Sequence, residues 1–180
     1  EVLKTLEDNS VDSIVTDPPY ELGFMGKKWD STGIAYNVEL WKECLRVLKP
    51  GGHLLAFGGT RTYHRMACAI EDAGFEIRDC IQWLYGSGFP KSHDISKAID
   101  KREGHWRGKA GKKLTENGSM VGGNYERSPK GEPVTTFAKQ WSGWGTALKP
   151  ANEPIVVARK PISEKTIAEN VLKWGTGGLN

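Results

Sequence analysis

Apolar residues recur along the chain with two spacings, which predict strands that alternate with helices. Val38, Trp41 and Leu45 recur every three or four residues, as on one face of a helix. By contrast, residues 155–157 form a β-branched run between prolines, which is typical of a buried strand. The pattern predicts strands over residues 11–16, 53–57, 75–84 and 155–158, and helices over residues 36–48, 62–73, 92–102 and 163–173.

This order of strands and helices predicts an α/β fold with a mostly parallel sheet. Strands that are separated by helices of about a dozen residues are joined by right-handed crossovers and run in the same direction. Such sheets bind ligands at the carboxyl ends of their strands, which places residues 17–20, 58–61 and 86–91 along one edge. In detail, we expect an apolar strand face of Phe75, Ile77, Ile81 and Trp83, an apolar helix stripe of Ile95, Ala98 and Ile99, and helix caps at Ser92 and Ser163.

The sequence Asp17-Pro18-Pro19-Tyr20 directly follows the first predicted strand. Proline has no N–H and keeps the preceding residue extended, so Asp17 and the Pro18 carbonyl are held as hydrogen-bond acceptors. Two acceptors suit the exocyclic NH₂ of a planar ring, because hydrogen bonds to both N–H groups favour a nitrogen whose lone pair can attack. Tyr20 adds a ring on which such a base can stack. The alternative is an ordinary turn, since Asp-Pro and Pro-Pro often end strands.

The composition is that of an ordinary globular domain, but the charge is unevenly distributed. The 180 residues are 38% hydrophobic and 26% charged, with a formal net charge of +3. Between Pro90 and Pro150, twelve Lys or Arg residues stand against six Asp or Glu residues, among many glycines and several aromatic residues. Basic side chains neutralise phosphates and aromatic rings stack on bases, so we expect this insertion to contact DNA. The alternative is a solvated linker.

The Asp17–Tyr20 motif resembles the catalytic motif of the amino-group DNA methyltransferases, which methylate adenine N6 or cytosine N4 with S-adenosylmethionine. Two further stretches, residues 24–30 and the Lys-Pro-Ala-x-Glu-Pro sequence from Lys149, resemble phage and prophage members of that family. The resemblance implies a partial, Rossmann-like S-adenosylmethionine-dependent methyltransferase fold with a basic, Gly-rich insertion. It also implies that Asp17 and the Pro18-Pro19 turn orient the amine and that Tyr20 stacks on a flipped base. An Asp in first place favours adenine N6 over cytosine N4.

The cofactor loop of that family, Phe-x-Gly-x-Gly, has no counterpart in the sequence. Gly86-Ser87-Gly88 is an alternative candidate, but Phe89-Pro90 follows it, and the resemblance maps this stretch to the loop that borders the target base. In the subgroup whose catalytic motif comes first, the cofactor loop lies downstream. We therefore expect the chain to be a fragment that binds S-adenosylmethionine poorly by itself. Asp17 would lie beside the cofactor, whose other contacts stay unassigned.

The chain is expected to contain four segments. They are a catalytic half (residues 1–89), the basic insertion as target-recognition region (90–149), a strand that rejoins the sheet (150–162), and a short helix with a tail (163–180). Candidate contacts to the base or to DNA are Lys27, Lys28, Trp29, Arg61, Tyr85, Phe89, Lys91, Lys109, Lys112, Lys113, Trp141 and Trp144.

Other features of the sequence narrow the range of possible functions. The sequence has no apolar run long enough to span a membrane, and its three cysteines lack a CxxC spacing. We expect buried free thiols at Cys44, Cys68 and Cys80, no metal, DNA as the partner, and a location in the cytoplasm of a bacterium or phage-infected host. An RNA or protein-glutamine N-methyltransferase, and a catalytically silent DNA-binding remnant, remain as alternatives. The oligomeric state is left open.

Overall fold

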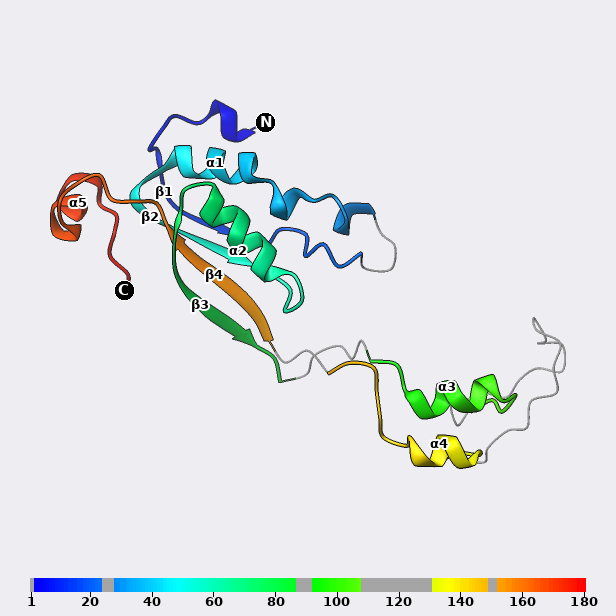
Figure 1. The fold of residues 1–180 in the computed structure, drawn as a ribbon. Coiled ribbons are helices and arrows are strands. Elements are labelled where there is room, and N and C mark those ends of the chain that lie inside the picture. The colour runs from blue at the N-terminus through cyan, green and yellow to red at the C-terminus, as the bar shows by residue number, and fades with distance from the viewer. Residues whose placement is uncertain (1, 24–27, 87–91, 108–130, 149–151) are drawn as a thin grey trace. The chain divides into compact units, whose positions relative to one another are not determined.

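The computed structural model describes residues 2–23, 28–86, 92–107, 131–148 and 152–180. The chain divides into two compact units: unit 1 comprises residues 1–87 and 151–180, and unit 2 comprises residues 88–150. Unit 1 contains 3-10 helices η1 (Val2–Thr5), η3 (Lys28–Asp30) and η4 (Ile34–Tyr36), helices α1 (Val38–Val47), α2 (Tyr63–Asp72) and α5 (Ile167–Trp174), and strands β1 (Val11–Thr16), β2 (Leu48–Phe57), β3 (Glu76–Leu84) and β4 (Asn152–Arg159) (Figure 1). Unit 2 contains α3 (Ile95–Arg102) and α4 (Thr136–Gln140).

Unit 1 is built on a four-stranded mixed sheet with the order β1-β2-β4-β3. The β1–β2 pair is parallel, with Thr16 opposite Ala56, whereas β4 runs antiparallel to both of its neighbours, β2 and β3. The expected α/β fold class is confirmed, and β1, β2 and β3 all point the same way. The sheet is nevertheless mixed, because β4 enters between β2 and β3 in the opposite direction and leaves one parallel ladder among the described strands.

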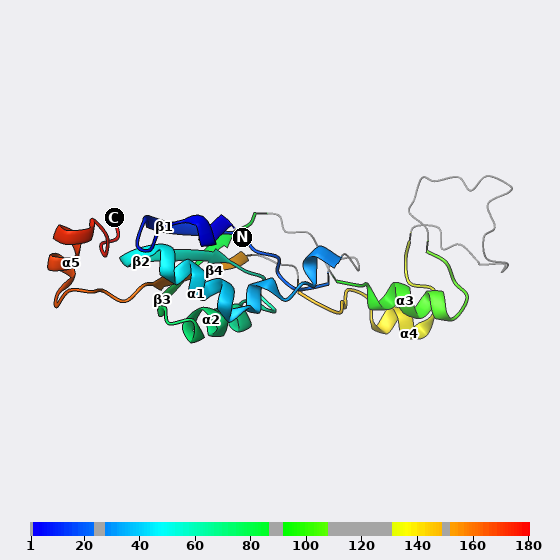
Figure 2. The same ribbon diagram turned by 90° about the horizontal axis from the view of Figure 1, so that it is seen from above.

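The core of unit 1 lies between the sheet and helices α1 and α2, which lie on the same side of it (Figure 2). Trp41 from α1, Ile70 from α2 and Leu54 from β2 are buried there. The indole N–H of Trp41 donates to the carbonyl of Ala35 at 3.0 Å, so the ring is buried without an unpaired donor. A fully buried side chain of this size contributes about 1.5–3 kcal/mol, so these contacts fix the helices on the sheet.

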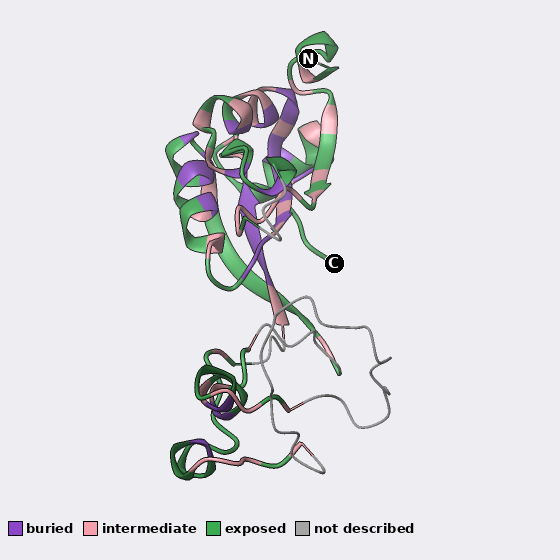
Figure 3. Cartoon of the chain, turned by 90° about the vertical axis from the view of Figure 1, so that its right-hand side faces the viewer, coloured by how far each residue is buried: buried purple, intermediate pink, exposed green. Residues whose placement is uncertain are grey.

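Strand β3 is exposed along residues 77–84, whichever face of the sheet they belong to (Figure 3). An irregularity in the β3–β4 ladder between Ile77 and Asp79 changes the side on which the later residues of β3 project. Ile77 pairs with Ala158 of the core face, whereas Ile81 pairs with Ile155 on the other face. The expected single apolar face of β3 is therefore wrong. The expected alternation of residues between the two faces does not hold along all of β3, because one extra residue at the irregularity reverses the face on which the later residues lie.

The β2 strand begins at Leu48, five residues earlier than predicted. The Pro50-Gly51-Gly52 sequence, which resembles a helix-to-strand turn, lies inside the strand at an irregular part of the β1–β2 ladder. The carbonyl of Pro50 accepts hydrogen bonds from Asn170 Nδ2 at 2.8 Å and Thr176 Oγ1 at 2.6 Å. Contacts from the C-terminal segment thus satisfy a backbone group that a turn would have exposed to water.

Two helix caps differ from the sequence-based expectation. Thr166 rather than Ser163 caps α5, through a reciprocal pair of hydrogen bonds with Glu169. Asp94 rather than Ser92 caps α3, because its carboxylate accepts from the backbone N–H of Lys97 at 3.0 Å. Acidic and hydroxyl side chains nearer to the first helical turn compete successfully with the serines.

Unit 2 is held together by a polar cluster. In α3 the buried residues are Ser96 and Asp100, whereas the expected stripe of Ile95, Ala98 and Ile99 is half-buried or exposed. The Asp100 carboxylate accepts from the backbone N–H groups of Val134 and Thr135, both at 3.0 Å. Helix α3 therefore docks through hydrogen bonds, which apolar periodicity does not detect.

The cysteines are only partly as expected. Cys44 is buried in the core of unit 1, and burial raises the pKa of its thiol to about 11. Cys68 and Cys80 are exposed, because Cys68 lies on the outer side of α2 and Cys80 on the uncovered strand β3. All three are free thiols. The expectation of three buried thiols is therefore correct for Cys44 alone.

Candidate active site

The Asp17–Tyr20 turn lies where the sequence predicts it, directly after the last residue of β1. Asp17 is exposed, whereas Pro18, Pro19 and Tyr20 are half-buried. Pairing of Thr16 with Ala56 of β2 fixes the end of the strand. The Asp17 carboxylate is therefore exposed to solvent, directly after a strand end that is fixed by pairing.

The loop after β2 supports the turn through Tyr20. The hydroxyl of Thr62 donates to the Tyr20 carbonyl at 2.6 Å. A Cβ added to Gly59 would lie 3.3 Å from Cδ2 of the Tyr20 ring, so the ring is packed closely on the backbone of that glycine. The loop after β2 thus holds the turn through one hydrogen bond and one close contact.

Glu153 adds a second carboxylate to the same edge. It lies near the start of β4, where the carbonyl of the next residue, Pro154, accepts a 2.9 Å hydrogen bond from the Gly58 N–H. Because β4 is antiparallel to its neighbours, its amino-terminal end lies beside the carboxyl-terminal ends of β2 and β3. From there, the Glu153 carboxylate contributes to the raised pKa values of Tyr20 and Tyr85.

The two tyrosines remain protonated over the whole neutral pH range. Burial, reinforced by the carboxylates of Asp17 and Glu153, raises the pKa of Tyr20 well above its ordinary value. Burial and the interaction with Glu153 raise the pKa of Tyr85 to about 12. Both hydroxyls are therefore donors beside two carboxylates. The site presents a surplus of acceptors, which suits a ligand that carries N–H groups or positive charge.

Glu153 is the site residue that sequence reasoning missed. The Lys-Pro-Ala-x-Glu-Pro sequence drew attention through its resemblance to a family, but no role was assigned to its glutamate. The only sign of a functional role in the sequence was a single acidic residue at the start of an apolar strand. Its position became meaningful only with the antiparallel direction of β4.

The other predicted site residues are distributed over both units. Arg61 is exposed in unit 1, next to Thr62, which bonds the Tyr20 carbonyl. Lys28 and Trp29 are exposed in η3 of the same unit. Trp141 and Trp144 belong to unit 2. The candidates outside the described residues are Lys27, Phe89, Lys91, Lys109, Lys112 and Lys113, together with most of the alternative glycine loop.

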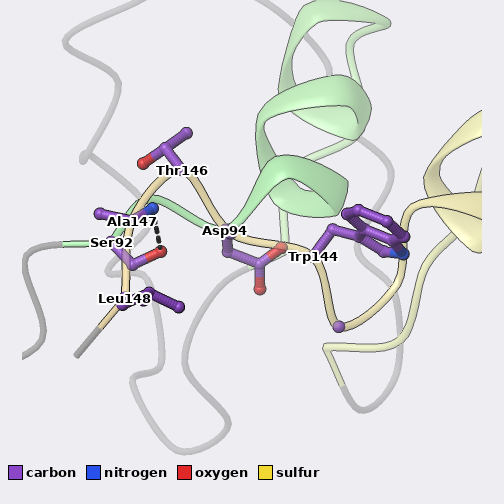
Figure 4. A pocket seen from close by; sticks show the side chains of 8 residues that line it. Ser92, Asp94, Trp144, Thr146, Ala147 and Leu148 are labelled. Carbon is purple, nitrogen blue, oxygen red and sulfur yellow. Dashed lines mark hydrogen bonds between the residues drawn. The ribbon is translucent and has the colours of Figure 1, made fainter.

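The Trp141 and Trp144 rings pack edge to face in unit 2, with centroids 5.2 Å apart. A pocket of about 550 Å³ is lined by Ser92, Asp94, Gly143, Trp144, Gly145, Thr146, Ala147 and Leu148 (Figure 4). The Ser92 hydroxyl accepts from the Ala147 N–H at 3.3 Å across this pocket wall. Both rings are exposed, and their role in stacking on bases stays a prediction.

Two properties of the described residues concern possible metal and membrane partners. No cluster of three or more His, Cys, Asp or Glu side chains in this part of the chain could hold a metal ion. No helix among the same residues is long and apolar enough to cross a membrane.

The fold and the site together define an α/β domain with an acceptor-rich edge at the ends of its strands. The chain belongs to the N6/N4 DNA methylase family, whose sequence model matches residues 11–174. It is 36% identical over 107 residues to the type II methyltransferase M.HpaI of Haemophilus parainfluenzae, covering 54% of this chain and 33% of that protein. It is 28% identical over 146 residues to M.HindIII of Haemophilus influenzae, covering 79% and 38%. The chain thus spans about a third of M.HpaI and somewhat more of M.HindIII.

Among solved structures, M1.HpyAVI aligns with a TM-score of 0.45 and 18% identity, over 89% of this chain and 51% of that one. M1.HpyAVI is also known as a complex with SAM, which aligns with a TM-score of 0.41 and 16% identity, over 89% of this chain and 48% of that one.

Proposed function

We propose that this chain forms the catalytic half of a DNA methyltransferase that uses S-adenosylmethionine to methylate the exocyclic amine of a flipped base. One observation carries the proposal: in a member of the DNA methylase family, β1 delivers the Asp17–Tyr20 acceptor turn to an edge that already holds a second carboxylate. The first-place Asp favours adenine N6 as the acceptor. A base inside a duplex has to leave the stack to reach such a turn.

The chemistry of the site fits the reactive end of the cofactor. When bound, S-adenosylmethionine supplies a methyl group on a positively charged sulfur, and the carboxylates of Asp17 and Glu153 complement that charge. No part of the sequence supplies the Phe-x-Gly-x-Gly loop that would hold the rest of the cofactor. In this proposal, the described edge serves the transfer step and other residues make the remaining cofactor contacts.

In the proposed reaction, the chain acts mainly by positioning and electrostatics. Asp17 and the Pro18 carbonyl accept hydrogen bonds from the amine and orient its lone pair, while Tyr20 stacks on the base. The nitrogen forms a bond to the methyl carbon as the sulfur–carbon bond breaks and its electron pair returns to sulfur. The amine then loses one proton, for which the Asp17 carboxylate is the adjacent acceptor.

The test is methyl transfer from labelled S-adenosylmethionine to unmethylated DNA by the intact protein, with the products identified as nucleosides by mass spectrometry. Asp17→Ala should lower kcat roughly 100- to 1,000-fold, because it removes an acceptor that matters mainly in the transition state. DNA binding should change little. Asp12→Asn is the matched control, because Asp12 lies within β1, away from the turn, and pairs with Lys49 at 2.6 Å.

Near-normal turnover of Asp17→Ala would remove the proposed role of the turn. N4-methylcytosine as the product would reverse the preference for adenine. Tyr20→Phe should be mild and Tyr20→Ala severe, since stacking requires the ring and not the hydroxyl.

A further inference from the structure

Glu21, the residue directly after the Asp17–Tyr20 turn, has a left-handed backbone with a φ of 55°. Among the residues that the structure describes, Asn9 is the only other non-glycine residue with positive φ. Asn visits this region readily, because its short polar side chain can bond to the local backbone, whereas Glu does so rarely. A residue in a conformation that it disfavours persists there only when the surrounding contacts enforce that conformation.

Hydrogen bonds hold the chain at Glu21 and at the residue before it. The carbonyl of Tyr20, in the peptide group that joins the two residues, accepts from the Thr62 hydroxyl at 2.6 Å. The Thr32 hydroxyl donates to the Glu21 carboxylate at 3.2 Å. The same hydroxyl accepts from the Ile34 N–H at 3.3 Å, at the start of η4. The strained link is therefore bonded to two other segments of unit 1.

The segment that holds the Glu21 carboxylate is itself anchored. The Gly23 N–H donates to the Asp30 carbonyl at 3.1 Å, so the chain after Glu21 is bonded to this segment independently of the carboxylate. Ala35 in η4 is buried, and its carbonyl accepts from the indole N–H of Trp41 in the core. Because the chain after Glu21 is fixed in this way, a change in its φ has to move the chain before it, which is the acceptor turn.

We propose that Glu21 is a positioning residue, whose left-handed backbone and hydrogen bond with Thr32 hold the Asp17–Tyr20 turn in the place that methyl transfer requires. The inference rests on the proposed function of that turn. It assigns to Glu21 no contact with substrate and no proton transfer. The bond with Thr32 keeps Glu21 at positive φ, and without this bond the residue relaxes and displaces the turn.

The first test compares Glu21→Ala, Glu21→Gln and Asp17→Ala in the intact protein, with labelled S-adenosylmethionine and unmethylated DNA. Glu21→Ala should lower kcat roughly 4- to 10-fold, the cost of a displacement of a few tenths of an ångström, with a smaller change in the KM for DNA. Glu21→Gln should keep a near-normal kcat, because its amide oxygen still accepts from Thr32. Glu39→Gln is the control, since Glu39 is exposed on α1 and pairs with Lys42.

The second test restores the backbone without the side chain. Glycine adopts positive φ without strain, so Glu21→Gly should recover much of the kcat that Glu21→Ala loses. Glu21→Val should have a lower kcat than Glu21→Ala, because a β-branched residue disfavours positive φ most strongly. Asn9→Gly is the matched control, because Asn9 has a φ of 56° in the turn before β1, and its kcat should equal that of the wild type.

Urea unfolding of the same variants measures the strain without methyl transfer. Glu21→Gly should unfold at a higher urea concentration than Glu21→Ala, and Glu21→Val at a lower one. The reverse order would show that Glu21 is not held at positive φ and would overturn the proposal.

Three kinetic results would also overturn it: a near-normal kcat in Glu21→Ala, or a loss in either Glu21→Gln or Glu21→Gly as large as in Glu21→Ala. The last two would mean that the carboxylate acts through its charge and not by holding the backbone. Full activity of Asp17→Ala would instead refute the proposed function. An inactive Asp17→Ala together with a fully active Glu21→Ala would refute this inference alone.

Discussion

A single methyl group at Gly59 tests whether the position of Tyr20 controls catalysis. The Cβ of Gly59→Ala would lie 3.3 Å from Tyr20 Cδ2 and 3.3 Å from Thr62 Oγ1. Carbon atoms in good contact are about 3.5–4.0 Å apart, so the ring has to move by a few tenths of an ångström. The glycine backbone itself is compatible with alanine, since Gly59 is not among the glycines with positive φ.

The displacement sets the expected size of the effect. If a misplacement of about 1 Å costs roughly 100-fold in rate, a shift of a few tenths of an ångström costs roughly 4- to 10-fold in kcat. The loss of stability should stay near the lower end of the roughly 1–3 kcal/mol typical of overpacking, because Thr62 and Tyr20 are only partly buried. Gly59→Ala should therefore impair turnover more than folding.

The assay is kcat of methyl transfer together with the thermal unfolding midpoint. Gly58→Ala should show the opposite pattern, a greater effect on stability than on turnover. Its Cβ would lie 2.9 Å from Tyr63 Cβ and 3.1 Å from Met66 Cε in the core. That variant should lose stability first. Gly178→Ala is the control, with no described atom within 4 Å of its Cβ. A wild-type kcat in Gly59→Ala would refute the link between the packing of Tyr20 and catalysis.

Two further predictions concern unit 2. Asp100→Ala should destabilise it by about 3–5 kcal/mol, because it leaves Arg107, 2.7 Å from the carboxylate, buried without its partner. Burial opposes ionisation of Asp100, but the hydrogen bonds from Val134 and Thr135 and the charge of Arg107 outweigh it and lower its pKa. This stabilisation is therefore present above the ordinary pKa of the carboxyl and should disappear as the pH falls through the lowered pKa. Tryptophan fluorescence during urea unfolding at a series of pH values measures both effects. An Asp100→Ala variant with an unchanged urea midpoint at neutral pH would contradict the prediction. Changing Lys109, Lys112 and Lys113 to Ala should weaken binding to unrelated DNA sequences equally and flatten the salt dependence by about 0.9 per lost phosphate contact, whereas an unchanged slope and affinity would indicate a solvated surface.

The sequence predicted those elements that are specified locally. The α2 helix agrees with its apolar periodicity to within a residue at each end, and β1 has the bounds of its apolar run. The Asp17–Tyr20 turn follows from the same reasoning, because prolines terminate a strand wherever it lies in the fold. Each of these features depends on residues within about one helical turn of one another.

Features that depend on distant partners were not predictable in this way. The start of β2 is decided by Asn170 and Thr176, which bond the Pro50 carbonyl from far along the chain. The buried face of α3 is decided by the N–H groups of Val134 and Thr135. In both cases a polar group is buried because a partner satisfies it, and hydrophobic patterning assigns such groups to the surface.

The position of Glu153 follows from the direction of one strand. In a fully parallel sheet, a residue at the start of a strand would lie at the edge opposite the carboxyl ends, far from Asp17. Because β4 is antiparallel, its start shares the edge with the ends of β1, β2 and β3, and Pro154, which cannot donate, still accepts the bond from Gly58 that fixes it there. Reversal of a single strand therefore adds a second carboxylate to a site that the sequence motif alone supplies with one.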